Sequence, residues 1–277
     1  MKQRQFGFSY APTSVNEAKG VTINRVIGGE RVAIFDPFIL LDHASIAAGS
    51  EVVGFKRHPH RGIETLSFVI SGEVGHKDSN GNEGTVGPDG SQWMTAGNGI
   101  YHEEMLIPGP EGAEFLQLWF SLPQDQKRIP SGYAGAQADT IPTVEVEGAK
   151  VAVVAGEFQG KSGVFPAIAV RPTVLDIAID PSATVEIPTI VGEAAFAYVV
   201  RGAVTIGEGS ATAPSVVFLT DGDLLTLTAK EDGARVFYVS AKPLNEPILQ
   251  YRSFVMNTVE DIQETVAMIQ DGTFAKY

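Results

Sequence analysis

The stretch HPHRGIETLSFVISGEVGHKDSNGNEG, residues 58 to 84, decides the expected fold of this chain. Apolar residues at 66, 68 and 70 alternate with the positions between them, which is the period-two pattern of a half-buried strand. Asn80 and Gly81 follow, and this pair can supply the positive φ angles of a tight hairpin turn. Similar short runs recur between the chain's 30 glycines and 16 prolines. The pattern therefore predicts an all-β fold.

A short internal repeat indicates that the chain holds two such β units. The segments FVISGEV (68–74) and YVVRGAV (198–204) share an aromatic residue, two valines and a glycine at equal spacing, 130 positions apart. The segment 123–142 is polar and rich in glycine and proline, which is typical of a linker. We expect a first β-barrel over 1–125, a linker over 126–142 and a second barrel over 143–277.

One helix is predicted near the C-terminus, within TVEDIQETVAMIQDG (258–272). Thr258 is a suitable N-cap with Asp261 three residues later, and Gly272 suits the helix exit. An apolar stripe, expected to pack against the core, lies at Val259, Ile262, Val266 and Ile269.

Composition excludes several functions. The 277 residues carry a formal charge of −13 without a basic stripe, so a nucleic acid is not expected as a direct partner. No cysteine is present, which excludes thiolate catalysis, iron–sulfur clusters and cysteine zinc sites. No stretch reaches the roughly 18 apolar residues of a membrane span, and the N-terminus lacks a signal-type apolar region. We expect a cytoplasmic protein without a membrane partner.

The five histidines all lie within the first 102 residues. In a strand, residues i and i+2 point to one face, so His58 and His60 project together. In YHEEM the same spacing joins His102 to Glu104 and turns Glu103 away. On neighbouring strands, these pairs bring three imidazoles and one carboxylate together.

An isolated H-x-H also fits two imidazoles on a surface turn. The second pair, the hairpin between the pairs and the confinement of histidine to this region favour a metal site. Three imidazoles and a carboxylate suit Fe(II), Mn(II), Co(II), Ni(II) or Cu(II), and Zn(II) is a further candidate.

Several other residues fit more than one role. Glu64 could be a further ligand or an acid/base, and Arg61 either a structural partner or a substrate contact. His43 is expected to be a satisfied loop histidine and His76 a surface residue of the hairpin. Core positions are expected for the aromatic residues Phe68, Trp93 and Trp119, with the wall of a pocket as the alternative.

The whole run 58–105 resembles the signature of the pirins, bicupin proteins of the cupin superfamily. Further similarity lies in DPFILLDH (36–43), FLQLWFSLP (115–123) and EPILQYRSFVMNT (246–258). The resemblance implies two cupin barrels of jelly-roll type that face each other in one chain, with a short C-terminal α-helix. It also implies one metal in the first barrel, held by the residues that match the family's ligands: His58, His60, His102 and Glu104.

Two departures follow from the resemblance and the repeat. Glu103 stands where pirins commonly have serine, which adds a carboxylate close to the site. The offset of 130 carries positions 58, 60 and 64 to Pro188, Ile190 and Ala194, none of which can ligate a metal. We therefore expect a second barrel without metal.

The resemblance implies Fe(II) and a quercetin 2,3-dioxygenase-type reaction, in which dioxygen cleaves the central ring of a flavonol. Glu104 would be the catalytic residue and accept the proton of the flavonol 3-hydroxyl. The alternative is a metal-dependent, redox-responsive regulatory protein that binds a protein partner without turnover. A monomer is expected, because two barrels in one chain bury surface on each other.

Overall fold

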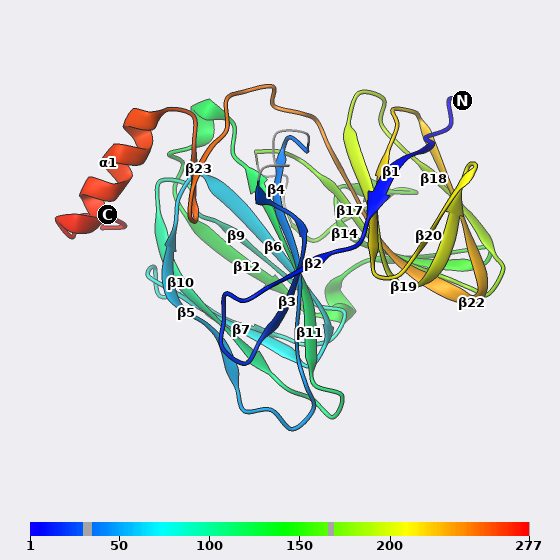
Figure 1. The fold of residues 1–277 in the computed structure, drawn as a ribbon, viewed down its shortest axis with the longest axis horizontal. Helices are drawn as coiled ribbons and strands as arrows, with labels where there is room; N and C mark the ends of the chain where they lie inside the picture. Colours follow the sequence, from blue (N-terminus) through cyan, green and yellow to red (C-terminus); the bar gives the residue numbers. More distant parts are fainter. Residues whose placement is uncertain (30–34, 166–168, 277) are drawn as a thin grey trace. The chain divides into compact units, whose positions relative to one another are not determined.

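The computed structural model describes residues 1–29, 35–165 and 169–276. This part of the chain is mostly β-strand and divides into two compact units (Figure 1). The first unit, which we call the histidine barrel, comprises residues 14–138 and 244–277 and holds all five histidines. The second, the aliphatic barrel, comprises residues 1–13 and 139–243. The unit boundaries thus differ from the predicted ranges, since the C-terminal segment groups with the histidine barrel.

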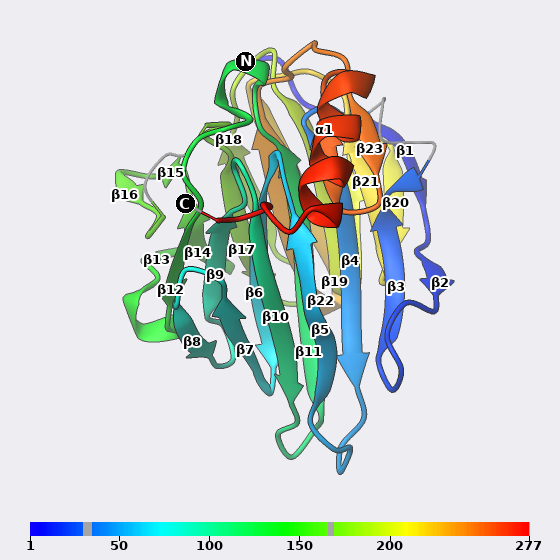
Figure 2. The same ribbon diagram turned by 90° about the vertical axis from the view of Figure 1, so that its left-hand side faces the viewer.

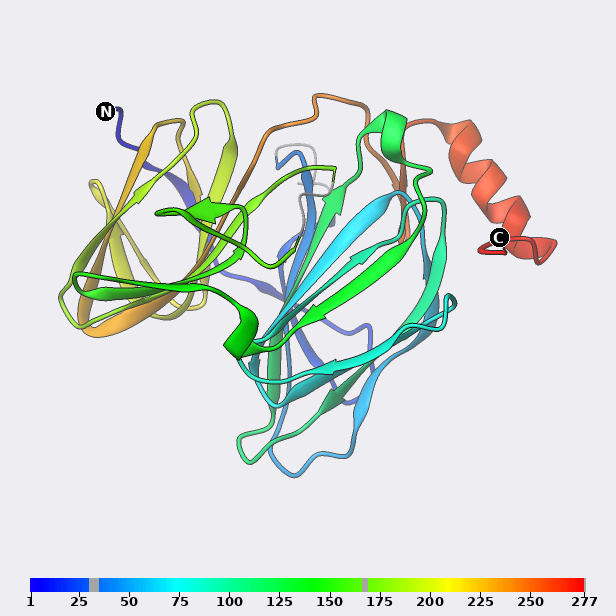
Figure 3. The same cartoon turned by 180° about the vertical axis from the view of Figure 1, so that it is seen from behind.

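The histidine barrel consists of two antiparallel sheets, which Figure 3 shows as two layers. The seven-stranded sheet has the order β12-β9-β6-β11-β4-β3-β2 and the four-stranded sheet the order β5-β10-β7-β8. The bounds in the larger sheet are β2 (Thr13–Val15), β3 (Thr22–Ile27), β4 (Phe38–Ile46), β6 (Ile63–Ser71), β9 (Ser91–Thr95), β11 (Ala113–Ser121) and β12 (Gly132–Ala136). In the smaller sheet they are β5 (Val53–His60), β7 (Glu73–Asp78), β8 (Glu83–Val86) and β10 (Ile100–Ile107).

Apolar side chains from both sheets form the core between them. Val69 and Phe115 of the larger sheet cluster with Val74 and Leu106 of the smaller one, and all four are fully buried. Apolar burial of this kind stabilises by about 25 cal/mol per Å² and holds the sheets face to face. Strand β12 lies within the range predicted as a linker and pairs with β9 instead.

The predicted hairpin at Asn80 and Gly81 joins β7 to β8, which pair antiparallel. Gly81 has a φ of 87°, whereas Asn80 is held by its amide, which donates to the Asp78 carboxylate at 2.9 Å. A side chain that accepts from the backbone two residues later is a common way to stabilise a turn. The loop is therefore tied to the end of β7.

The C-terminal segment folds onto the histidine barrel as a hairpin, β23 (Leu249–Tyr251) and β24 (Phe254–Met256), followed by the helix α1 (Val259–Gln270), drawn in red in Figure 2. The helix and its cap are confirmed: Thr258 Oγ1 accepts from the Asp261 amide at 3.1 Å. The predicted apolar stripe is wrong at Val259, which is 53% exposed. The buried residue of the helix is Thr265, whose hydroxyl accepts from the Arg61 guanidinium at 2.8 Å.

The aliphatic barrel is built on one nine-stranded sheet of order β1-β21-β19-β22-β17-β14-β13, with β18 paired to β22 and β20 to β19. Its bounds are β1 (Phe6–Tyr10), β13 (Thr143–Val146), β14 (Ala149–Ala155), β17 (Thr173–Ile179), β18 (Thr184–Pro188), β19 (Ala194–Ile206), β20 (Gly209–Thr212), β21 (Ser215–Leu219) and β22 (Leu224–Ala241). The remaining elements are the hairpin β15 (Glu157–Phe158) and β16 (Lys161–Ser162) and the 3₁₀ turns η2 (Gln124–Gln126) and η3 (Ala138–Thr140). Valine, isoleucine, leucine and alanine side chains dominate the interior of the aliphatic barrel.

The internal repeat occupies comparable positions in the two barrels. Phe68 lies on β6 and Tyr198 on β19, both in the middle of a sheet and both buried. The repeat's glycines, Gly72 and Gly202, have φ values of 67° and 72°, which a residue with a side chain rarely adopts.

Within the described ranges, no helix combines the length and apolar composition needed to cross a bilayer.

Candidate metal centre

The pairing of β5 with β10 brings the two histidine motifs together. His58 lies directly opposite His102 in the ladder, and His60 opposite Ile100. Along β10, burial alternates so that His102 and Glu104 are buried and Glu103 is turned outward, where it lies opposite Lys77 of β7. Cross-strand partners share one face of a sheet, so the imidazoles project to the inside of the barrel.

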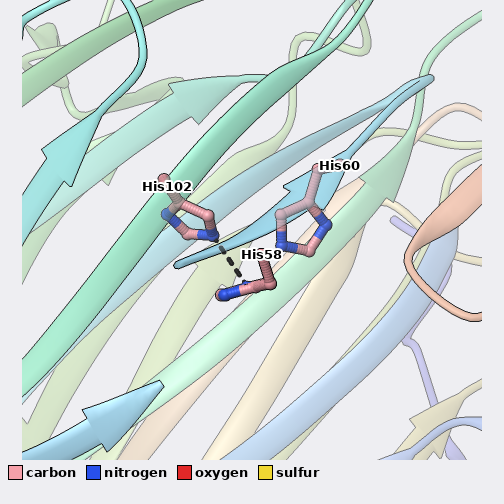
Figure 4. A group of neighbouring side chains, drawn as sticks. All are labelled: His58, His60 and His102. Atoms are coloured by element: carbon pink, nitrogen blue, oxygen red, sulfur yellow. Dashed lines mark hydrogen bonds between the residues drawn. The ribbon is translucent and has the colours of Figure 1, made fainter. Parts of the chain in front are cut away.

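The three imidazoles form a tight cluster (Figure 4). The ring centroid of His58 lies 4.8 Å from that of His60 and 4.5 Å from that of His102. The centroids of His60 and His102 are 4.8 Å apart. One ring nitrogen from each residue lies within 4.8 Å of the others. This spacing lets a single cation contact all three imidazoles.

The hydrogen bonds of these rings leave lone pairs directed at the centre of the cluster. His58 Nδ1–H donates to the Lys56 carbonyl at 2.8 Å, so its Nε2 carries a lone pair. That Nε2 lies 3.1 Å from His102 Nε2. Neither ring nitrogen of the buried His60 has a hydrogen-bond partner of good geometry among the described residues.

The electrostatics of the cluster favour neutral rings. Burial lowers the pKa of His58, and it lowers the pKa of His60 and His102 well below the usual value, with help from the neighbouring imidazoles. A contact with the Ser253 backbone raises the pKa of His60, but by less than burial lowers it. Buried imidazoles with unused lone pairs are unfavourable unless a cation satisfies them, so the donor set fits a divalent transition metal.

Glu104 does not belong to the tight imidazole cluster in this structure. It is 3% exposed and lines the same cavity as His58 and His60. Its Oε1 accepts from Ser67 Oγ and Gln92 Nε2, both at 3.1 Å, and its Oε2 accepts from Gln117 Nε2 at 2.9 Å. Burial raises the pKa of Glu104 to about 7, and the three hydrogen bonds oppose this only in part.

The residues that hold Glu104 come from a polar row across the larger sheet. Gln92 of β9 lies opposite Ser67 of β6, which lies opposite Gln117 of β11. The sequence reasoning missed this row, although Gln117 interrupts the apolar run of β11. Because buried polar side chains need partners, such interruptions signal a polar site inside the barrel.

A cavity of about 880 Å³ opens at the cluster. Its wall includes Phe115 and Trp119, and the Trp119 ring stands edge-on to His60 with centroids 4.8 Å apart. Trp119 is therefore half-buried and lines the cavity, so the alternative of a pocket wall holds for it instead of the core position. Phe68 and Trp93 are buried, as predicted.

The structure places the other sequence candidates outside the cluster. Glu64 is fully buried on β6, where Thr95 donates to it at 2.9 Å, and it does not line the cavity. His43 lies on β4 rather than in a loop and contacts Glu114 at 2.5 Å. Arg61 is fully buried and donates to Thr265, which supports its structural role.

His76 lies inside the barrel and not on its surface. The prediction of a surface hairpin residue is wrong, because the side chain is buried and its Nδ1 lies 3.5 Å from His102 Nδ1. The signal was present: His76 and Asp78 form a third histidine pair with i, i+2 spacing, so both point to the inner face with His102.

Two cupin domains in one chain, one of which carries a buried histidine cluster, define a bicupin. The family described as Pirin matches residues 20–120, and the Pirin C-terminal cupin domain matches residues 174–275. The chain therefore belongs to the pirin family.

Similar proteins cover nearly the whole chain. A Pseudomonas aeruginosa protein named "Putative quercetin 2,3-dioxygenase" is 35% identical over 269 residues, which cover 94% of each chain. The crystal structure of quercetin 2,3-dioxygenase from Acinetobacter baumannii matches with a TM-score of 0.90 and 30% identity, covering 99% of each chain. A bacterial pirin from Escherichia coli, solved in complex with nickel(II), matches with a TM-score of 0.68 and 21% identity, covering 85% of this chain and 100% of that one, which supports the fold alone.

Proposed function

We propose that this pirin is a metal-dependent dioxygenase of the quercetin 2,3-dioxygenase type, with the metal held by His58, His60, His102 and Glu104. The observation that carries the proposal is the convergence of three buried imidazoles, of which His60 has no hydrogen-bond partner of good geometry among the described residues, at a cavity that Glu104 also lines. The similarity to the Pseudomonas and Acinetobacter proteins supports the choice of reaction.

The donor set of three nitrogens and one oxygen suits a divalent transition metal, and we propose iron(II). When bound, the metal supplies a Lewis acid that lowers the pKa of a substrate hydroxyl and a redox-active centre for reaction with dioxygen. Glu104 would complete the set by exchanging one of its present hydrogen bonds for a bond to the metal.

Glu104 is also the proposed proton acceptor. Without metal, burial raises the pKa of Glu104 to about 7. A Glu104 carboxylate that loosens its bond to the metal would therefore take the proton of a flavonol 3-hydroxyl near neutral pH, since a general base works best when its pKa lies near the operating pH. Gln92 and Gln117 lie on the two strands that flank Ser67, and each donates to one oxygen of the Glu104 carboxylate. These bonds would keep the Glu104 carboxyl group oriented while its protonation changes.

The cavity matches a small planar substrate. Its volume of about 880 Å³ lies within the roughly 300–1,000 Å³ of typical small-ligand sites, and Phe115 and Trp119 supply aromatic walls. Flat apolar walls beside a few oriented polar groups would hold a flavonol ring and limit the access of water to it.

The proposal is tested by metal content and by quercetin consumption on the purified protein, with and without dioxygen. We expect about one metal per chain and oxygen-dependent loss of quercetin. His58→Ala should lose both metal and activity. Glu104→Gln should lose activity, whereas the matched control Glu103→Gln, which changes a neighbouring carboxyl on the outer face, should retain it.

Loss of quercetin that is equal in wild type and His58→Ala would contradict the proposal. Stoichiometric metal without oxygen-dependent turnover would also contradict it, and would favour a metal-dependent regulatory protein with a protein partner.

A further inference from the structure

Two buried side chains of β7, His76 and Asp78, lie next to the imidazole cluster. Strand β7 lies beside β10, with His76 opposite Glu104 and Asp78 opposite His102. Because opposite residues share a face, all four side chains project into the barrel interior from neighbouring positions of the four-stranded sheet. His76 and Asp78 are 5% and 8% exposed, so water competes little for their contacts.

Asp78 determines which nitrogen of His76 carries the proton. The carboxylate accepts from the backbone amides of Asn80 and Asn82 at 2.9 and 3.0 Å and from Asn82 Nδ2 at 2.9 Å. Its Oδ2 lies 3.2 Å from His76 Nε2. A carboxylate only accepts hydrogen bonds, so His76 Nε2–H is the donor and the neutral ring carries its lone pair on Nδ1.

The tautomer of His76 in turn bears on which nitrogen of His102 carries the proton. The Nδ1 atoms of the two rings lie 3.5 Å apart, at the long end of a hydrogen bond. With a lone pair on His76 Nδ1, a hydrogen bond at this contact requires the proton on His102 Nδ1. His102 Nε2 then carries a lone pair, as does His58 Nε2, so these two atoms, 3.1 Å apart, do not share a proton and need a cation to satisfy both.

Tyr133 of β12 fixes His76 from its other side. The two rings stack with centroids 4.0 Å apart and planes 7° apart. The Tyr133 hydroxyl donates to Gln92 Oε1 at 3.0 Å, and Gln92 Nε2 donates to Glu104. The ring has room because residue 84 is glycine: a Cβ there would lie 2.5 Å from Tyr133 Oη.

We propose that His76, held by Asp78 and Tyr133, is a positioning residue of the metal centre that fixes His102 with its proton on Nδ1 and its Nε2 lone pair toward the metal. This inference rests on the proposed function for the metal itself. Residues that hold a metal-binding histidine in one tautomer raise its basicity and limit its rotation, and their loss typically weakens metal affinity 10- to 100-fold.

The test compares two variants with the wild type. His76→Phe keeps an aromatic ring to stack on Tyr133 and removes both ring nitrogens. His76→Gln keeps an acceptor for His102 and a donor for Asp78. His43→Phe is the matched control, because it removes another buried strand histidine next to a carboxylate, outside the cluster. Circular dichroism establishes that each variant is folded.

The first measurement is the ¹⁵N chemical shift of the histidine ring nitrogens in the full-length protein stripped of metal. We expect a protonated Nδ1 for His102 and a protonated Nε2 for His76 in the wild type. In His76→Phe, His102 should lose its fixed tautomer, and in the control it should keep it. A wild-type His102 protonated on Nε2 would overturn the proposal.

The second measurement is nickel(II) affinity by competition with a chelator, together with the absorption spectrum of the cobalt(II) protein. His76→Phe should weaken nickel(II) binding about 10- to 100-fold and shift the cobalt(II) bands, while His76→Gln should restore most of both. Affinity within twofold of wild type in His76→Phe would overturn the proposal, and so would an equal loss in the control. If the wild type bound no metal but showed the expected tautomers, the proposed function would fail while the hydrogen-bonded arrangement stood.

Discussion

Replacement of Glu64 by glutamine should make the histidine barrel more stable above neutral pH. The side chain is fully buried on β6, and Thr95 donates to its Oε1 at 2.9 Å. Burial raises the pKa of Glu64 from 4.5 to about 8, an effect that the hydrogen bonds of Thr95 and Trp93 only partly offset. The folded protein therefore retains a proton that the unfolded chain releases.

The sign and size of the effect follow from this difference in proton binding. Between pH 4.5 and 8 the folded state binds more protons at Glu64 than the unfolded state, so the free energy of unfolding falls as pH rises. At about 1.36 kcal/mol per pH unit, the pKa range from 4.5 to about 8 gives an upper limit of roughly 5 kcal/mol. Glutamine cannot ionise and should remove this slope.

The assay is urea unfolding of the metal-stripped protein at pH 5, 6.5 and 8, followed by tryptophan fluorescence. Both tryptophans lie in the histidine barrel, so the signal reports the unit that contains Glu64. The buried histidines oppose the slope, because their lowered pKa values make stability rise with pH up to about 6.5, but they do so equally in both proteins. Glu111→Gln, at an exposed position, controls for the loss of a charge. Parallel pH profiles for wild type and Glu64→Gln would refute the reasoning.

Three further predictions concern the site and its supports. Nickel(II) affinity of the wild type should fall about tenfold between pH 8 and pH 6, because Glu104 with a pKa near 7 must lose its proton to bind the metal, and Glu104→Gln should flatten this dependence in a chelator competition assay. Gly84→Ala should lower the free energy of unfolding by about 1–3 kcal/mol in urea, since its Cβ would lie 2.5 Å from Tyr133 Oη; an unchanged midpoint would show that the ring is not confined. Thr265→Val should cost about 1–3 kcal/mol in the same assay, because it removes an acceptor of the buried Arg61 guanidinium, and a Thr265→Ser variant should recover most of it.

Local pattern was sufficient for much of the fold. Alternation predicted β6, the pair Asn80 and Gly81 predicted the turn between β7 and β8, and the capping residue Thr258 predicted the start of α1. The parity of two strands selected His58, His60, His102 and Glu104 as side chains of one interior face, because side-chain direction in a strand depends only on whether a position is odd or even.

The support of the site depended on tertiary structure. Ser67, Gln92 and Gln117 meet only because three strands pair in one register, and no local rule specifies that register. His76 has the same parity signal as His102, yet its burial depends on β12, which brings Tyr133 over it from a segment that composition assigned to a linker.

The sequence by itself thus determined the type of donor atoms, the face on which each lies and the family to which the chain belongs. The tertiary structure decided which groups the imidazole nitrogens contact, which carboxyl group lies at the cavity and which is enclosed elsewhere. The physical reason is that a side chain's direction is local, whereas burial, hydrogen-bond partners and hence pKa arise from strands that are distant in sequence and adjacent in space.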